Sequence, residues 1–243
     1  MEVLMKFSFS FVFLLLCFFI GNPYAAALNY PVQIGNKTVH IKVWPAKSDK
    51  VVVHLHENEI TALKAAQKIT RKHPATVISL AHGGGRDIVF YLNHQRFECD
   101  PNRIFSDRGI KNTLVQHGHY SKAAHRAVKR LAVEILKHIP NGRIIAVHNN
   151  QYYSMKDYFP RHPLASEALA IAYAKKEAYR NFYLVTQVSD FKRLKALGEN
   201  VVLQSEKAQD DGSLSTYFHQ SSYVNVEAGL GQYSAQLHML SRL

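Results

Sequence analysis

The chain has 243 residues, of which 47% are hydrophobic, 11% aromatic and 20% charged. This composition supplies enough apolar residues for a folded core and excludes a disordered, collagen-like or low-complexity chain. The net charge of +12 would suit a nucleic-acid partner, but the basic residues are scattered and form no nucleic-acid-binding motif. We therefore predict no nucleic-acid partner and a solvated basic surface, which would also suit acidic substrates or anionic envelope polymers.

The N-terminal segment has the pattern of a secretory signal. An unbroken run of apolar residues and serine covers Phe7–Ile20, and Pro23 and the small residues Ala25–Ala27 follow it. This order predicts a signal peptide over 1–27, whose removal leaves a domain over 28–243 that is periplasmic or secreted and has no membrane attachment. An uncleaved anchor is the alternative, but the run is shorter than the roughly 20 residues that span a bilayer.

Hydrophobic periodicity then divides the chain into alternating strands and helices. The first half is predicted to contain strands over Val39–Trp44 and Lys50–His56, a helix over Asn58–Lys72, strands over Thr76–Leu80 and Arg86–Leu92, and a helix from the N-cap Ser121 to about His138. The second half is predicted to contain a strand over Arg143–His148, a helix over Leu164–Lys176, a strand over Phe182–Thr186, a helix over Asp190–Leu197, strands over Asn200–Gln204 and Ser222–Val226, and a helix over Gln232–Leu240. This alternation predicts a single α/β domain with a mixed, largely parallel sheet flanked by helices.

Residues of the types that a metallohydrolase uses stand at the carboxyl ends of three predicted strands. His56, His148 and Glu227 each end one strand, and ligands of open α/β sheets gather at that edge. Glu59 follows His56 at the H-x-x-E spacing, so both side chains can reach one ion if the chain turns between them. With His148 as a third ligand, this is the donor set of a catalytic zinc site. The H-x-x-E spacing alone is also compatible with a surface or capping role.

The segment Asp100-Pro101-Asn102-Arg103 is polar and loop-like and has no evident structural role. Asp100 would accept the free ring N–H of His56, which is the usual partner of a ligand histidine. Arg103 would bind a substrate carboxylate with its two parallel N–H donors. The alternative is a turn with a solvated arginine.

Four segments together resemble the zinc carboxypeptidases of the funnelin type, the M14-like group that also includes aspartoacylase-like deacylases. The segments are LHENEITALKAAQKI, CDPNRIF, IIAVHNN and YVNVEAGLGQYS, in the family's own order. They run from His56 to Glu227 and cover most of 28–243. The resemblance implies a carboxypeptidase-like fold and Zn²⁺ as the cofactor, with His56, Glu59 and His148 as its ligands.

The same resemblance implies roles for five further residues. Asp100 would orient a ligand histidine, and Asn102 and Arg103 would bind the terminal carboxylate of the substrate. Glu227 would be the general base, and Arg86 lies upstream of Arg103 at about the distance of the family's oxyanion-stabilising arginine. The implied activity is hydrolysis of an amide bond next to a free carboxylate. The substrate would be a peptide, cell-wall peptides included, or an acylated amino acid.

The chain also departs from the family pattern. Removal of the leader would leave 243 − 27 = 216 residues, fewer than a typical peptidase of this group, so we expect shortened specificity loops. The segment Glu206–Asp211 lacks the mobile tyrosine of classical members, although Tyr217 and Tyr223 follow it. These departures bear on substrate specificity more than on metal chemistry.

Other functions fit parts of the sequence. His82-Gly83-Gly84-Gly85 matches the oxyanion-hole pattern of lipases, but no G-x-S-x-G nucleophile segment is present, so we expect a flexible turn. Cys99 is a candidate nucleophile, but the adjacent Asp100 disfavours a thiolate, so we expect a buried structural cysteine. A non-catalytic protein that binds an envelope ligand on a retired hydrolase fold is the alternative of a different class.

Two further histidine groups offer metal ligands. His54 shares a strand face with His56, and we expect it to pack in the core. His117-Gly118-His119 also offers two imidazoles, and we expect this segment to be a loop. Tyr152, Tyr153 and Tyr158 follow His148 in the sequence and would either line a substrate pocket or pack in the core.

Overall fold

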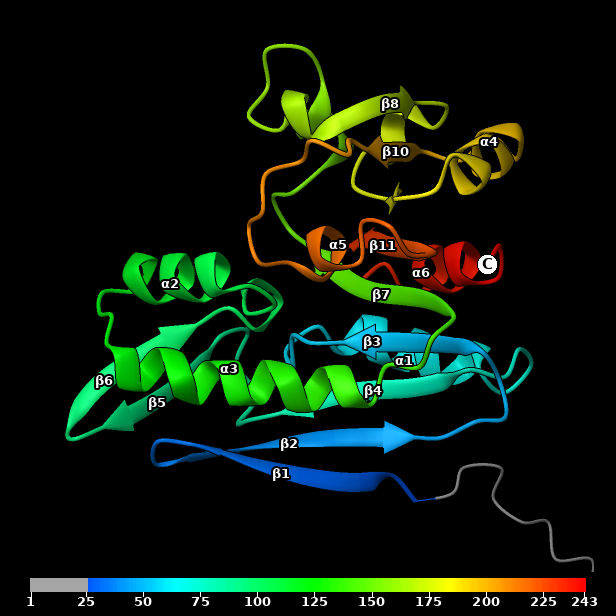
Figure 1. Ribbon diagram of the computed structural model, residues 1–243. Helices are drawn as coiled ribbons and strands as arrows, with labels where there is room; N and C mark the ends of the chain where they lie inside the picture. The colour runs from blue at the N-terminus through cyan, green and yellow to red at the C-terminus, as the bar shows by residue number, and fades with distance from the viewer. Residues whose placement is uncertain (1–25) are drawn as a thin grey trace, which may run out of the picture.

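The computed structural model describes residues 26–243, so the predicted signal peptide over 1–27 lies outside the described residues except for its last two. The described chain forms a nine-stranded mixed sheet with helices on both faces, together with a separate two-stranded hairpin (Figure 1). This architecture confirms the predicted mixed α/β fold. None of the helices within residues 26–243 combines the length and apolar character needed to cross a bilayer.

The order of the strands explains where a site can form. From edge to edge the sheet contains β1 (Leu28–Ile34), β2 (Lys37–Trp44), β4 (Thr76–Ala81), β3 (Lys50–His54), β7 (Arg143–Asn150), β11 (Tyr223–Gly229), β9 (Phe182–Val185), β10 (Val201–Gln204) and β8 (Ala168–Ala172). The central strands β4, β3, β7 and β11 are parallel to one another, whereas β1, β2, β8 and β9 each make an antiparallel pair. The carboxyl ends of β3, β7 and β11 therefore meet at one edge of the sheet.

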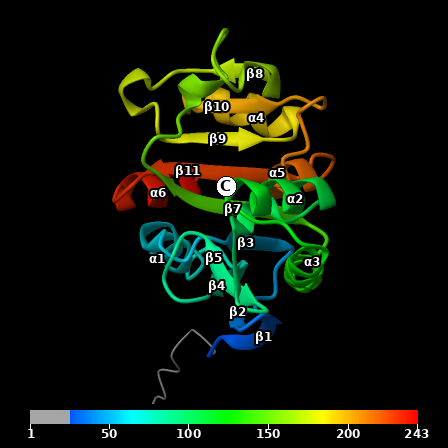
Figure 2. The ribbon, with the colours of Figure 1, turned by 90° about the vertical axis from the view of Figure 1, so that its left-hand side faces the viewer.

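The helices cover the two faces of this sheet. They are α1 (Ile60–Ile69), α2 (Asp107–Gln116), α3 (Lys122–Lys137), α4 (Val188–Ala196), α5 (Leu214–Tyr217) and α6 (Tyr233–Leu240). Figure 2 shows α1 and α6 on one side of the sheet and α2 and α3 on the other. Side chains of β3 alternate between the two cores, because Val51 and Val53 belong to the core that includes α2 and α3, whereas Val52 belongs to the core that includes α1, α4 and α6.

Helix α3 shows how closely local sequence can specify an element. Its predicted N-cap, Ser121, accepts a hydrogen bond from the backbone N–H of Ala124. The predicted inward residues Ala124, Val128, Leu131 and Ile135 are all buried. Burying each of the larger aliphatic side chains contributes about 1.5–3 kcal/mol relative to exposure. The cap and the buried stripe together confirm this prediction.

The predicted helix over Leu164–Lys176 is wrong. Its centre is the edge strand β8, which pairs antiparallel with β10, and only short 3₁₀ turns flank it. The alanine-rich sequence favours a helix locally, but the open edge of β10 supplies backbone hydrogen bonds, and such tertiary pairing overrides a weak local preference.

The predicted strand Arg86–Leu92 exists as β5 (Ile88–Leu92), but it pairs with β6 (Gln95–Cys99) in the separate hairpin rather than with the main sheet. The turn between them places Asn93 and His94 at φ +48° and +63°. Two left-handed residues are typical of a type I′ hairpin turn, usually signalled by Asn-Gly. The prediction missed β6, because this turn carries histidine instead of glycine, and it also missed β1, α2 and α5.

Candidate metal centre

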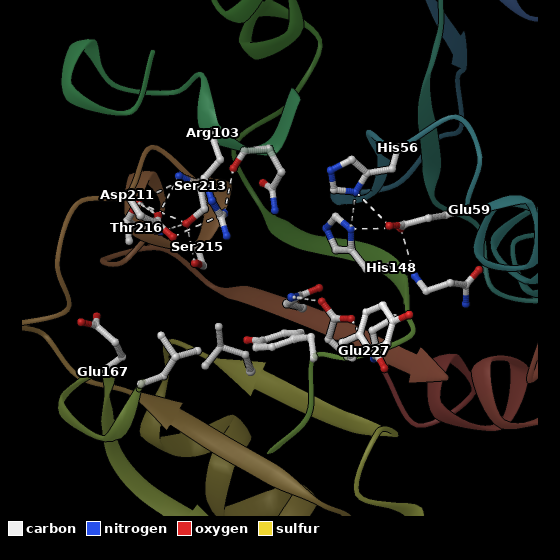
Figure 3. Close-up of a pocket in the computed structure, with 18 of the residues that line it drawn as sticks. His56, Glu59, Arg103, His148, Glu167, Asp211, Ser213, Ser215, Thr216 and Glu227 are labelled. Carbon is white, nitrogen blue, oxygen red and sulfur yellow. Dashed lines mark hydrogen bonds and ion pairs between the residues drawn. The ribbon is translucent and has the colours of Figure 1, made fainter. Parts of the chain in front are cut away.

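The three predicted metal ligands meet at the carboxyl edge of the central strands (Figure 3). His56 lies two residues beyond β3, Glu59 directly precedes α1, and His148 lies in β7. The Nδ1 atoms of His56 and His148 are 3.1 Å apart. Oε1 of Glu59 lies 3.1 Å from Nδ1 of His56, and its Oε2 lies 3.2 Å from Nδ1 of His148. All three residues are buried.

The local backbone explains why the H-x-x-E spacing works here. The backbone N–H of Glu59 donates to the carbonyl of His56 at 3.0 Å, which closes a turn between strand β3 and helix α1. The backbone N–H of Asn149 donates to Oε2 of Glu59 at 3.0 Å, and the Asn149 side chain accepts from the N–H of Ala62 at 2.8 Å. Asn149 therefore ties the first turn of α1 to β7 and holds the Glu59 carboxylate beside His148.

His54 contacts the backbone of this turn. Its ring nitrogens lie 2.9 Å from the Ser79 hydroxyl and 3.0 Å from the carbonyl of Glu59. Burial lowers the pKa of His54 from 6.5 to about 4, so the ring is neutral at pH 7. The expected packed core histidine is confirmed, with the addition that it positions the backbone of a candidate ligand.

Asp100 contacts the opposite nitrogen of His56, as the sequence predicted. His56 donates its Nε2–H to Oδ1 of Asp100 at 2.8 Å. Burial alone would lower the pKa of His56, but Asp100 and Glu59 outweigh it and raise this pKa from 6.5 to about 9. The histidines in turn hold the pKa of the Glu59 carboxyl well below its usual range despite burial. The carboxylates of Glu59 and Asp100 therefore flank the ring of His56 and favour its charged form.

The donor set fits a zinc ion. Two imidazole nitrogens and one carboxylate are the usual ligands of a catalytic zinc site, and two ligand atoms around a tetrahedral zinc lie about 3.3–3.4 Å apart. The separations of 3.1–3.2 Å between the three side chains come close to this value. Asp100 supplies the outer partner of His56, whereas Nε2 of His148 is buried and has no polar protein partner.

Glu227 lies beside the cluster on strand β11. It is the register partner of His148 across the parallel β7–β11 pair, so both side chains emerge on the same face of the sheet. Asn225 donates to its Oε1 at 3.0 Å and Asn150 donates to its Oε2 at 3.1 Å. Each carboxylate oxygen of this buried residue therefore has an amide donor that fixes its orientation. The sequence did not indicate a role for either asparagine, although each lies within two residues of a predicted site residue.

The structure places Arg86, Asn102 and Arg103 at the same cavity. Arg86 donates to Oε1 of Glu59 at 2.5 Å, and its other terminal nitrogen lies 3.7 Å from Asp100. Asn102 and Arg103 belong to a 3₁₀ turn, η1 (Pro101–Arg103), whose cap is the Asp100 side chain. Both arginine side chains are nearly half exposed, so neither charge is sealed away from a ligand.

Arg103 already has an acidic neighbour that the sequence did not predict. Its Nη1 lies 3.4 Å from Oδ2 of Asp211, and Figure 3 shows this pair grouped across from the histidines. Asn102 accepts the backbone N–H of Leu214 through its side-chain oxygen at 3.2 Å. This bond leaves the amide NH₂ of Asn102 as a donor beside the guanidinium of Arg103.

One cavity of about 650 Å³, a size within the range of small-molecule sites, is bordered by the three candidate ligands and by Glu227, Arg86, Asn102, Arg103 and Asp211. Polar residues of its remaining wall include Gln204, Ser215 and Asn225. Tyr153 and Tyr158, which pair through their hydroxyls, line it as well. Tyr223 also lines the cavity and is buried, whereas Tyr217 is about half exposed and packs against Phe105.

The glycine run has a role that differs from an oxyanion hole. The backbone N–H groups of His82, Gly83 and Gly84 all donate to Oε2 of Glu57 at 2.5–2.8 Å. Gly83 and Gly84 adopt φ +116° and +84°, a conformation that side chains rarely allow. The carboxylate of Glu57 thus occupies this nest of N–H groups and anchors the turn that carries the candidate ligands.

The cysteine alternative finds no support. Cys99 is fully buried in the core, and burial together with the neighbouring carboxylates raises the pKa of its thiol. A thiolate is therefore strongly disfavoured at neutral pH. The structure agrees with the expected buried structural cysteine.

Comparison with solved structures finds a similarity to a succinylglutamate desuccinylase/aspartoacylase from Rhodobacter sphaeroides, with a TM-score of 0.40 and 10% sequence identity. The match covers 89% of this chain but only 62% of that protein. No protein-family model matches the chain, and neither does any curated protein sequence. A similarity this distant carries no information on activity, so the functional argument rests on the side chains of the site.

Proposed function

We propose that this protein is an exported, zinc-dependent hydrolase that cleaves an amide bond next to a free carboxylate. The observation that carries the proposal is the convergence of His56, Glu59 and His148 on one point, with Glu227 beside them and Arg103 across the same cavity. Export rests on the N-terminal sequence alone.

His56, Glu59 and His148 would hold the zinc ion in this proposal. When bound, zinc would polarise the scissile carbonyl and lower the pKa of water toward neutrality. Glu227 accepts the proton of the attacking water and passes it to the leaving nitrogen as general base and then acid. The amide groups of Asn150 and Asn225 hold the Glu227 carboxylate in one orientation during both transfers.

The arginines supply the complementary positive charge. Arg86 stabilises the negative oxygen that develops on the carbonyl, a contribution that preorganised donors make most effectively. Arg103 and the free NH₂ of Asn102 bind the carboxylate next to the scissile bond. This binding fixes the reacting amide beside Glu227, and the substrate carboxylate then competes with Asp211 for Arg103.

The substrate in this proposal is a peptide with a free C-terminus or an acylated amino acid. An envelope peptide would suit an exported enzyme. A test compares an N-acyl amino acid and a short peptide with the same two molecules carrying a C-terminal amide in place of the carboxylate. Zinc-reconstituted protein should hydrolyse at least one carboxylate substrate and should cleave its amidated counterpart at least about 100-fold more slowly in kcat/KM.

The matched variants are Arg103→Gln and Arg108→Gln. Arg103→Gln should lose the preference for the carboxylate, whereas Arg108, which does not line the cavity, should tolerate the change. Equal cleavage of the free and amidated substrates would contradict carboxylate recognition. Zinc binding without cleavage of any substrate would favour the non-catalytic alternative.

A further inference from the structure

A second cluster of metal-ligating side chains lies outside the cavity, at the base of the β5–β6 hairpin. Asp87 directly precedes β5, Glu98 lies in β6, and His117 is the C-cap of α2. One ligand atom from each side chain lies within 4.8 Å of one from each of the others. The three side chains are 19–24% exposed, so all are mostly shielded from solvent yet reachable by an ion.

The side chains of this cluster approach one another at distances longer than a hydrogen bond. His117 Nε2 lies 3.9 Å from Oδ2 of Asp87, and its Nδ1 lies 3.7 Å from Oε1 of Glu98. Both distances exceed a hydrogen bond. They involve opposite nitrogens of the ring, of which one would bind the ion, and one oxygen of each carboxylate lies within 4.8 Å of that nitrogen. Oδ1 of Asp87 is also buried without any hydrogen-bond partner, and a lone buried carboxylate oxygen is costly.

Arginine and carboxylate groups surround the cluster. Arg96 pairs with the far oxygen of Glu98. Arg86 forms its ion pairs with Glu59 and Asp100 and acts on Asp87 only through its charge, without an ion pair. Burial is the largest cause that raises the pKa of Asp87, and the nearby charge of Asp100 raises it further. Two carboxylates and an imidazole form a mixed oxygen and nitrogen donor set, which favours a transition metal such as zinc over calcium, since calcium prefers oxygen ligands.

We propose that Asp87, Glu98 and His117 bind a second divalent transition-metal ion, with water completing its coordination. The ion joins both strands of the hairpin to the end of helix α2. Arg86 is adjacent to Asp87, and Asp100 lies two residues beyond Glu98. The second ion therefore fixes the two ends of the hairpin that enter the candidate active site, and this role is independent of the proposed hydrolysis.

The test counts zinc ions by calorimetric titration of the chelator-stripped protein with Zn²⁺. The wild-type protein should bind two ions per chain, and His117→Ala and His148→Ala should each bind one. His119→Ala is the matched control, because His119 is exposed on the same segment and is outside the cluster, and it should keep two. Zinc should also raise the Tm of His119→Ala more than that of His117→Ala.

Asp87→Asn is the second test variant, since it keeps the size of the side chain and removes only its charge. It should also bind one ion while retaining the wild-type near-ultraviolet circular dichroism. Wild-type binding of a single ion, or binding by His117→Ala that matches His119→Ala, would overturn the proposal. Loss of one ion in His117→Ala but none in His148→Ala would support this second site and contradict the first.

Discussion

The proton on His56 should control zinc affinity. Asp100 and Glu59 outweigh the effect of burial and raise the pKa of His56 from 6.5 to about 9, and a histidine must be neutral to bind a metal. For a single proton with this pKa, the neutral fraction is about 1% at pH 7 and about 50% at pH 9. The apparent zinc affinity should therefore rise about 50-fold between these two pH values.

Competition with a zinc chelator of known affinity measures this slope, corrected for zinc hydrolysis. The parent protein should be His117→Ala, so that only one candidate cluster is titrated. Asp100→Asn removes a strong cause of the raised pKa, so its affinity should change much less with pH. Asp211→Asn removes a carboxylate of the same cavity that does not contact His56, and it should keep the slope of the parent.

Two results would refute this reasoning. The parent protein would bind zinc equally well at pH 7 and pH 9 if no proton had to leave His56. Asp100→Asn would match Asp211→Asn in slope if the hydrogen bond to Asp100 did not sustain the raised pKa. In either case the contact of 2.8 Å would have no part in setting the protonation of the ligand.

Three further outcomes are expected. Glu227→Gln should keep stoichiometric zinc and lose about 10²–10⁴-fold in kcat, and full turnover in a steady-state assay would exclude Glu227 as the base. Glu57→Gln should weaken the anion nest, lower the free energy of unfolding by about 1–2 kcal/mol and weaken zinc binding, whereas the surface change Glu134→Gln should do neither. Metal-free protein should lose stability between pH 6.5 and 9. The protonated His56, whose pKa is raised in the folded state, stabilises the fold fully below pH 6.5 and no longer does so above pH 9. The loss should be at most about 3 kcal/mol, and denaturant titrations that show rising stability over this range would contradict it.

The residues that could be predicted from sequence are those fixed by strand ends. His56, His148 and Glu227 follow buried apolar runs, and parallel strands bring such positions together at one edge of the sheet. Glu59 follows from a turn of three residues. The convergence of these four side chains in the structure is therefore a consequence of pattern and topology that a sequence can carry.

Contacts between loops could not be predicted in this way. Asp211 meets Arg103 only because the chain before α5 folds over the 3₁₀ turn, where Gly109 and Gly212 lie in close backbone contact. The anchoring of Glu57 by the glycine run requires two left-handed glycines, and the sequence shows the glycines but not their partner. The helix predicted over Leu164–Lys176 was wrong for a related reason, since the structure of β8 depends on the free edge of β10 and not on its own residues.

The most direct test of the central claim is the anomalous diffraction of crystals of the zinc-reconstituted protein, measured at the zinc absorption edge. The proposed zinc site requires a peak within bonding distance of His56, Glu59 and His148 that disappears in His148→Ala. A protein that is folded and saturated with zinc but shows no peak among these three side chains would contradict it.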